Sequence, residues 1–337
     1  MRTITKNQHY VPQAYLKCFS PDNSSIGTLC IEDGRFFEKA PIKGQAKKEW
    51  FYDRDNKIEN SFSEIEGLFL QNRLSIALNP KNELTCYQRE VMYQDMIIQL
   101  MRTLNMANII NSKAKAEADL VWKHNNNPLI RELADITTVT IPNAIVHAMY
   151  AFCQHPYILL DLKWKLLINN TEIPFITSDN PVSLYNQFLE KRNSNICGLA
   201  TAGLQVFYPL LPKFGVLYYD GEIYKCGVSK RHFIEINRSD VFHLNRLTSL
   251  NATKNIYYNP ELVNSTYLND LVSSTKNCRV KRFSKTEIPV SSNSSYVITK
   301  QIIPLCKIHL SFIKELSKAQ SRKTLSNREN VIMGRDW

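Results

Sequence analysis

Zinc-knuckle spacing, glycine-rich repeats and long apolar stretches are all missing from this chain of 337 residues. Its eight cysteines lie at least twelve residues apart, which excludes the Cys-x-x-Cys spacing of zinc knuckles and redox dithiols. The ten glycines are too few for a collagen-like chain or a flexible linker. The most apolar stretch, residues 157–168, is interrupted by Asp161, Lys163 and Lys165. We therefore expect no transmembrane helix.

The common catalytic signatures are absent as well. The sequence contains no GxGxxG or GxxxxGK[ST] phosphate loop, no HExxH zinc motif and no GxSxG nucleophile elbow. An acid-x-Lys pair occurs at Asp161–Lys163, but it precedes Asp179. That order is the reverse of the order in PD-(D/E)xK nucleases, so the simple form of this motif is not supported.

The N-terminus and the cysteines indicate a compartment. Residues 1–15 contain no apolar run of signal-peptide length. Scattered cysteines in such a chain are typical of small buried hydrophobic residues. We therefore expect a cytoplasmic protein that makes no contact with membranes.

The composition is that of a globular protein. Hydrophobic residues make up 44% of the chain and charged residues 22%, and 35 residues are aromatic, too many for a disordered chain. The length allows two domains or one large one. We expect a single core domain over residues 1–290, followed by a basic helical extension over residues 291–337.

The first half of the chain is predicted to be mixed and then helical. Within residues 1–60 we expect a short helix over 12–19 and a hairpin over 28–37. Apolar residues at helical spacing predict a helix over 62–78. Residues 85–118 contain no glycine or proline and predict one long helix. A further helix is expected over 142–154, so that residues 61–156 form a helical part.

Residues 157–290 are predicted to be rich in strands. Alternating apolar residues over 160–168, a turn at 169–171 and an apolar segment over 173–177 indicate a hairpin. Residues 205–211 and 214–219 indicate a second one. Further predicted elements are strands at 233–236 and 256–258, and helices at 241–252 and 303–319. The expected fold class is α+β, with the helical part packed against mostly antiparallel strands.

The positive charge is concentrated near the C-terminus. Residues 273–337 contain 13 Lys and Arg but four Asp and Glu, a net charge of +9, whereas the rest of the chain carries +2. Nucleic acid is the polyanion that such a basic segment most often binds. The alternative is a solvated tail that maintains solubility.

Four segments combine polar side chains with proline or an apolar run. They are residues 7–16, 99–103, 175–182 and 208–212. Asp95, Gln99 and Arg102 share one helical face. Segment 175–182 ends an apolar strand in small polar residues, which is a common position for site residues.

Together these segments resemble the family called domain of unknown function 4238. The matching motifs are His9-Tyr-Val-Pro-Gln-Ala-Tyr-Leu, Gln99-Leu-Met-Arg-Thr, Phe175-Ile-Thr-Ser-Asp-Asn-Pro-Val, Tyr208-Pro-Leu-Leu-Pro and Leu244-Asn245. They stand in the family's order over about residues 5–260. The family often has proline after Arg-Thr. Leu104 replaces it here, so we expect the helix to continue without a kink. The resemblance implies no established activity. A role in bacterial defence is an expectation by association.

The first hypothesis is a nuclease-like enzyme that hydrolyses phosphodiesters in nucleic acid. Its site would lie in a cleft between the helical and strand-rich parts. The proposed catalytic residues are His9 as general acid or base, Arg102 as phosphate ligand, Asp179 and Gln99. Asp179 would also hold a divalent metal ion or orient His9. The proposed substrate-binding residues are Tyr10, Gln13, Ser178 and Asn180.

The second hypothesis is a binding module for nucleic acid or protein in which the same polar residues are structural. His9 would form hydrogen bonds at a helix start, Asp179 would cap a turn, and Arg102 would pair with Asp95 or another carboxylate. Burial and complete hydrogen bonding of these residues would favour this hypothesis, whereas an accessible pocket between His9 and Asp179 would favour the enzyme.

Overall fold

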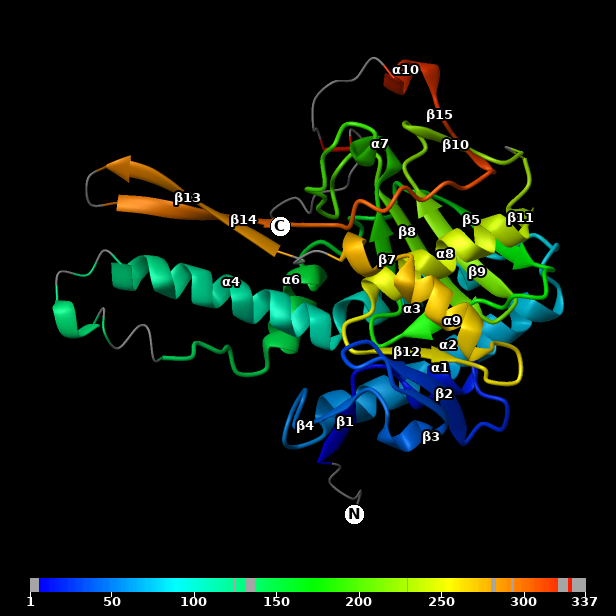
Figure 1. Ribbon diagram of the computed structural model, residues 1–337, viewed down its shortest axis with the longest axis horizontal. Coiled ribbons are helices and arrows are strands. Elements are labelled where there is room, and N and C mark those ends of the chain that lie inside the picture. The colour runs from blue at the N-terminus through cyan, green and yellow to red at the C-terminus, as the bar shows by residue number, and fades with distance from the viewer. Residues whose placement is uncertain are drawn as a thin grey trace.

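The described residues form an α+β fold in which helices surround a five-stranded and a four-stranded sheet, and three further pairs of strands lie outside these sheets (Figure 1). The computed structural model describes residues 6–123, 125, 127–130, 132, 137–228, 230–279, 283–291, 294–320 and 327–328. No helix within these ranges is both long and apolar enough to cross a membrane.

The larger sheet has five strands and forms the centre of the molecule. Its order is β11 (Phe233–Ile236), β5 (Lys163–Asn169), β9 (Phe214–Tyr219), β8 (Gln205–Leu211) and β7 (Ser183–Tyr185). All neighbours are antiparallel except β11 and β5. The strands are buried almost throughout. Both faces must therefore be covered by other elements.

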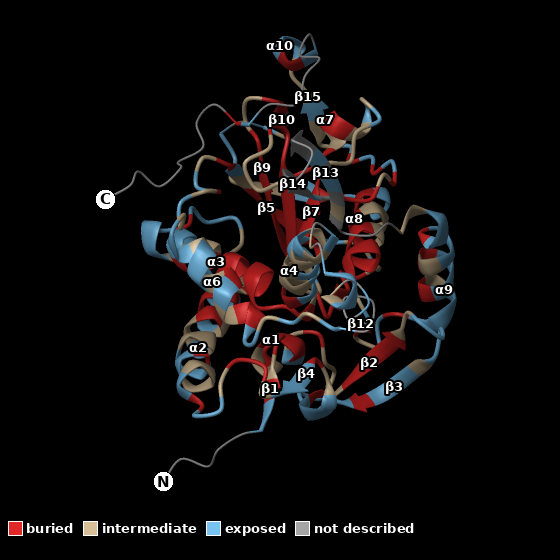
Figure 2. Ribbon diagram, turned by 90° about the vertical axis from the view of Figure 1, so that its left-hand side faces the viewer, coloured by how far each residue is buried: buried red, intermediate tan, exposed pale blue. Residues whose placement is uncertain are grey.

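Helices cover the two faces of this sheet (Figure 2). The elements on one side are α2 (Lys57–Leu78), α3 (Cys86–Met101) and α6 (Ala144–Cys153). The helix on the other is α8 (Arg238–Asn251), and α9 (Ser265–Ser273) packs against α8 and against Leu29, Ile256 and Tyr258 of the smaller sheet. Capping boxes begin α3 at Thr85 and α8 at Asn237.

A second sheet has four strands, and the N-terminal segment packs beside it. Its order is β3 (Phe36–Pro41), β2 (Ser25–Cys30), β12 (Asn255–Tyr258) and β6 (Thr177–Ser178). The N-terminal elements are β1 (Asn7–His9), α1 (Gln13–Lys17), η1 (Ile42–Gly44) and β4 (Lys47–Glu49). β1 pairs with β4. The predicted hairpin over 28–37 is confirmed by β2 and β3.

An arm projects from the body (Figure 1). It consists of α4 (Leu104–Lys123) and the hairpin β13 (Phe283–Ser291) and β14 (Ser294–Gln301), which contacts α4. The remaining elements lie on the body: α7 (Gln187–Glu190), β10 (Tyr224–Cys226), β15 (Ile313–Glu315), α10 (Ser317–Gln320) and η2 (Lys276–Cys278).

Three predicted elements are wrong. Residues 173–176 form no strand, and β6 pairs with β12 instead of β5, because β5 is already flanked by β9 and β11. Residues 303–310 form neither a helix nor a strand, and they place Ile303, Ile308 and Leu310 in the main core. The domain boundary at residue 290 stays a prediction.

The third error is the long helix over 85–118. The chain leaves the helix at Arg102 and Thr103, where Arg102 has φ −86° and ψ 6°. The Thr103 hydroxyl accepts a hydrogen bond from Met106 N at 3.3 Å, and α4 begins at Leu104. A proline is therefore not needed for the break. The contacts of Arg102 described below account for it.

Candidate functional site

Gln8 directly precedes the N-terminal motif and is fully buried. Its amide oxygen accepts a hydrogen bond from Tyr52 N at 2.7 Å, and its amide nitrogen donates to Asp53 O at 2.7 Å. Both ends of the amide are thus used to hold the loop that precedes α2. The position of His9 and Tyr10 follows from this anchor.

Arg102 is the largest side chain that the protein buries completely. Its guanidinium donates to Tyr52 Oη at 2.9 Å, to Glu66 Oε1 at 2.7 Å and to the backbone oxygen of His9 at 2.7 Å. It also lies 4.2 Å from the centre of the Phe62 ring. These contacts join β1, α2 and the end of α3, and they leave no free edge for a phosphate.

His9 contributes its backbone oxygen to this arrangement, and its side chain is half-buried. Burial lowers the pKa of the His9 imidazole below 6.5, and the positive charges of Lys47 and Arg102 lower it further. His9 is therefore neutral at pH 7. Within the described residues its Nε2 atom has no hydrogen-bond partner, and no hydrogen bond joins it to Asp179.

Asp95 pairs with Arg73 rather than with Arg102. Arg73 donates from Nε and Nη2 to the two Asp95 oxygens at 2.7 and 2.6 Å, and both side chains are about 97% buried or more. Nη2 of Arg73 also donates to Tyr208 Oη at 2.8 Å. A bidentate pair with added hydrogen bonds is the arrangement that compensates two buried charges. Of the two partners predicted for Arg102, Asp95 or another carboxylate, the structure shows the second, because Arg102 pairs with Glu66.

The Tyr208 side chain is buried and makes its contacts inside the protein. The Tyr15 ring stacks on that of Tyr208, with centroids 5.6 Å apart. The Tyr15 hydroxyl lies 2.8 Å from Thr177 Oγ1 and donates to the backbone oxygen of Pro209 at 2.7 Å. This links the N-terminal, third and fourth motifs across the interior.

Asp179 is buried and bonded to the backbone after α8. Its two oxygens accept hydrogen bonds from Thr253 N and Lys254 N, each at 2.8 Å. Burial raises the pKa of the Asp179 carboxyl to about 6, although these backbone N–H groups oppose the shift. The carboxylate thus caps the turn that leads from α8 into β12.

The neighbours of Asp179 have the same role. The Ser178 hydroxyl donates to the backbone oxygen of Asn180 at 2.9 Å. The Asn180 amide donates to Asn251 O at 3.1 Å, and Asn251 donates back to Asn180 O at 2.8 Å. Asn245 similarly joins α8 to the backbone of Pro174 and Ile176. The third motif is therefore fastened to α8 at several points.

The other predicted site residues are also placed by packing. Tyr10 is buried against Phe51, with ring centroids 5.5 Å apart, and lies near enough to Asp179 for that charge to help raise the Tyr10 pKa. Gln99 is fully buried on α3, one turn after Asp95. Gln13 is partly buried at the start of α1. The N-terminal segment is thus bonded to Arg102 through the His9 backbone oxygen, and its Tyr10 lies near Asp179 in the interior of the protein.

The metal-binding hypothesis does not fit this geometry. Both Asp179 oxygens already accept backbone hydrogen bonds. Among the described residues, no three His, Cys, Asp or Glu side chains come together as they would around an ion. We therefore assign no metal to Asp179.

Arg73 and Gln8 are the structural residues that sequence analysis did not select. For Arg73 a signal was present, because it stands four residues after Phe69 and three before Ile76, on the apolar stripe of α2. A charge on such a stripe predicts a buried partner. Gln8 offered no such signal, because its partners are mostly backbone atoms of a distant loop.

The cavities described in the structure lie elsewhere. One, of about 750 Å³, lies between α3, α6 and residues 156–164. The other, of about 520 Å³, lies over β2 and β3. None of the predicted site residues lines either cavity.

The chain belongs to the family described as "Protein of unknown function (DUF4238)", whose model matches residues 7–261. The match includes all five motifs and confirms the family identified from the sequence. No curated protein matches the chain, and no solved structure does.

Proposed function

We propose that this protein is a nucleic-acid-binding module whose motif residues stabilise the fold and do not cleave the bound strand. One observation carries the structural part of this proposal: Arg102 and Asp179, the proposed phosphate and metal ligands, already have hydrogen-bond partners within the protein. The three guanidinium nitrogens of Arg102 donate to Tyr52, Glu66 and His9. Both Asp179 oxygens cap residues 253–254.

The location of positive charge supports the binding part. Lys276, Lys300, Lys307 and Lys314 are exposed, and none of the four has an ion-pair partner in the part of the chain that the structure describes. Exposed lysines of this kind are free to contact phosphates.

The two arginines of this segment that the structure describes are used differently. Arg279 donates to the backbone oxygens of Ser249 and Ala252. Arg328 is buried and donates to Asp161 and to the backbone oxygen of Leu199. These two side chains hold the C-terminal segment to the body, so among its described residues the four lysines are the groups left for a polyanion.

The test is the salt dependence of binding to labelled duplex DNA, single-stranded DNA and RNA, measured by fluorescence anisotropy. We expect the log–log slope of the wild type to become shallower by up to about 0.9 per lysine when Lys276, Lys300, Lys307 and Lys314 are changed to Gln. The control changes four exposed lysines outside the segment to Gln: Lys17, Lys39, Lys57 and Lys113. It should leave the slope unchanged.

Two results would refute the proposal. One is an equal loss of affinity in both sets of variants, which would show a general effect of net charge. The other is metal-dependent cleavage by the wild type that Asp179→Asn abolishes without lowering the melting temperature, which would support the nuclease.

A further inference from the structure

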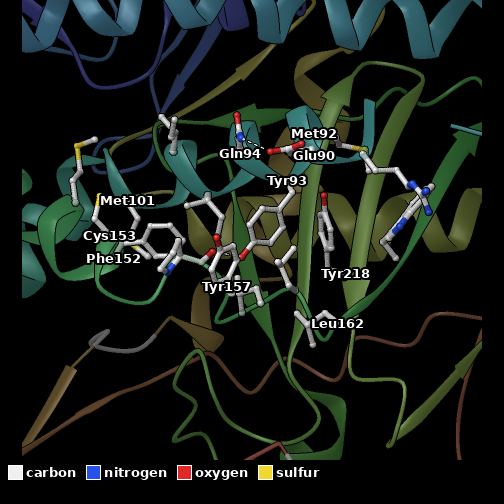
Figure 3. A pocket seen from close by; sticks show the side chains of 18 residues that line it. Glu90, Met92, Tyr93, Gln94, Met101, Phe152, Cys153, Tyr157, Leu162 and Tyr218 are labelled. Atoms are coloured by element: carbon white, nitrogen blue, oxygen red, sulfur yellow. Dashed lines mark hydrogen bonds between the residues drawn. The ribbon is translucent and has the colours of Figure 1, made fainter. Parts of the chain in front are cut away.

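The 750 Å³ cavity beside α3 has the dimensions of a small-molecule site (Figure 3). Tyr93 and Tyr218 lie at its centre with ring centroids 6.4 Å apart and an angle of 74° between the rings. Met101, Phe152 and Cys153 gather at one end. The cavity is thus formed by α3, α6, the loop after α6 and the two inner strands β5 and β9 of the central sheet.

The wall of this cavity is mainly apolar. Methionines from both helices line it, together with aromatic and aliphatic side chains such as Phe152 and Leu162. Methionine adapts its shape to irregular ligands and makes favourable contacts with aromatic rings. The Tyr93 hydroxyl is already bonded to Pro156 O at 2.9 Å, and the Tyr218 hydroxyl points toward α3. The surface presented to an occupant is therefore largely carbon.

Charged and amide groups of the lining are confined to the exposed surface of α3. They are Arg89, Glu90 and Gln94. Arg89 and Glu90 have opposite charges, and Glu90 accepts a hydrogen bond from Gln94 at 3.3 Å. A charged ligand that moved from water into the cavity would find no partner for its charge there. The desolvation of that charge would therefore be unfavourable.

The mouth of the cavity exposes apolar surface. Tyr157 is 54% exposed and Leu160 is 48% exposed, and both line the cavity. Contiguous apolar surface around a cavity is typical of a ligand site, whereas isolated apolar residues on a surface have no such meaning. Here the exposed pair continues directly into the apolar wall.

We propose that this cavity binds an uncharged, largely apolar small molecule that contains an aromatic or alicyclic ring. The lining includes none of the lysines considered above and none of the predicted site residues, although Met101 of the motif over residues 99–103 contributes to it. Occupancy of the cavity neither requires nor excludes nucleic-acid binding.

The experiment compares two fluorescent probes of the same shape. N-phenyl-1-naphthylamine is uncharged, and 1-anilinonaphthalene-8-sulfonate carries a sulfonate on the same rings. We expect saturable binding of the uncharged probe, with one site per chain, and affinity weaker by about fivefold or more for the sulfonate. Equal or tighter binding of the sulfonate would overturn the assignment of an uncharged ligand.

Two exposed cysteines provide a matched pair of positions. Cys153 lines the cavity, whereas Cys86, at the start of α3, does not. Cys153→Trp should fill one end of the cavity and weaken binding of the uncharged probe by about tenfold or more. Cys86→Trp should leave the affinity unchanged. Both variants should have the melting temperature of the wild type, which shows that the loss does not come from unfolding.

Alkylation of the wild type gives an independent readout. The saturating uncharged probe should slow the reaction of a maleimide with Cys153 and leave the reaction of Cys86 unchanged. Equal affinity in the two tryptophan variants, or equal protection of both thiols, would overturn the site. A third result would also overturn the site: a Cys153 thiol that does not react even without the probe, in a protein that light scattering shows to be a dimer. A second copy of the chain would then occupy the cavity.

Discussion

The two faces of α3 differ in their surroundings, because one is buried in the interior and the other lines an open cavity. One face carries Asp95 and Gln99, which are fully buried, and ends at Arg102. The other carries Tyr93, Ile97 and further apolar residues that line an open cavity. The charged side chains of the buried face, Asp95 and Arg102, each meet several donors or acceptors, and this is the condition under which a buried charge is tolerated.

Replacing Arg102, at the end of the buried face, should cause the largest loss of stability. Arg102→Met should lower the free energy of unfolding by about 3 kcal/mol or more, because Glu66, Tyr52 and the His9 carbonyl would lose their partner. Urea unfolding measures this. Arg238→Ala removes an exposed arginine that pairs with Glu172 and should change stability by less than about 1 kcal/mol. Similar losses in the two variants would contradict a structural role for Arg102.

The Asp179 cap should show a smaller loss that depends on pH. Asp179→Asn removes one of two acceptors and should destabilise the protein by about 1–3 kcal/mol. Because the pKa of Asp179 is raised to about 6 in the folded protein, the folded state binds the proton more tightly than the unfolded state. The contribution of this group is therefore fully present below about pH 4 and is lost as the pH rises through 6.

The stability difference between wild type and Asp179→Asn should accordingly be larger at pH 4.5 than at pH 7. The variant lacks the titrating group, so other ionisations cancel in the difference. Chemical unfolding at the two pH values measures it. A difference that grows toward pH 7 would show that the backbone hydrogen bonds lower the pKa more than burial raises it.

Two tyrosines on neighbouring strands should differ in how much their hydroxyl groups contribute to stability, and this is the smallest of the predicted effects. The Tyr208 hydroxyl accepts from Arg73 and contacts Asp95, whereas the Tyr218 hydroxyl is buried without a hydrogen-bond partner among the described residues. Tyr208→Phe should cost about 1–2 kcal/mol, and Tyr218→Phe should be neutral or slightly stabilising. Thermal melts of the two variants test this. An equal cost would mean that the Tyr218 hydroxyl has a partner in solution.

Much of the local structure could be predicted from the sequence. The apolar spacing of residues 62–76 and the proline at 80 define most of α2. The two residues between β8 and β9 identify their hairpin. The errors arose where a distant segment supplies the hydrogen bonds: β6 pairs with β12, which lies about 80 residues further along the chain. Local patterns carry no information about such a partner.

The sequence by itself established the family, the α+β class and the set of polar segments, because these depend on residue type and spacing over a few turns of chain. It could not establish whether those segments face solvent or one another. That depended on contacts such as Arg102 with His9 and Asp179 with Lys254, which join residues 93 and 75 positions apart. The residue type of an arginine or aspartate is the same whether its side chain binds a substrate or forms hydrogen bonds inside the protein. The packing of α2, α3 and α8 around the sheets enclosed these groups, and it left the apolar face of α3 open.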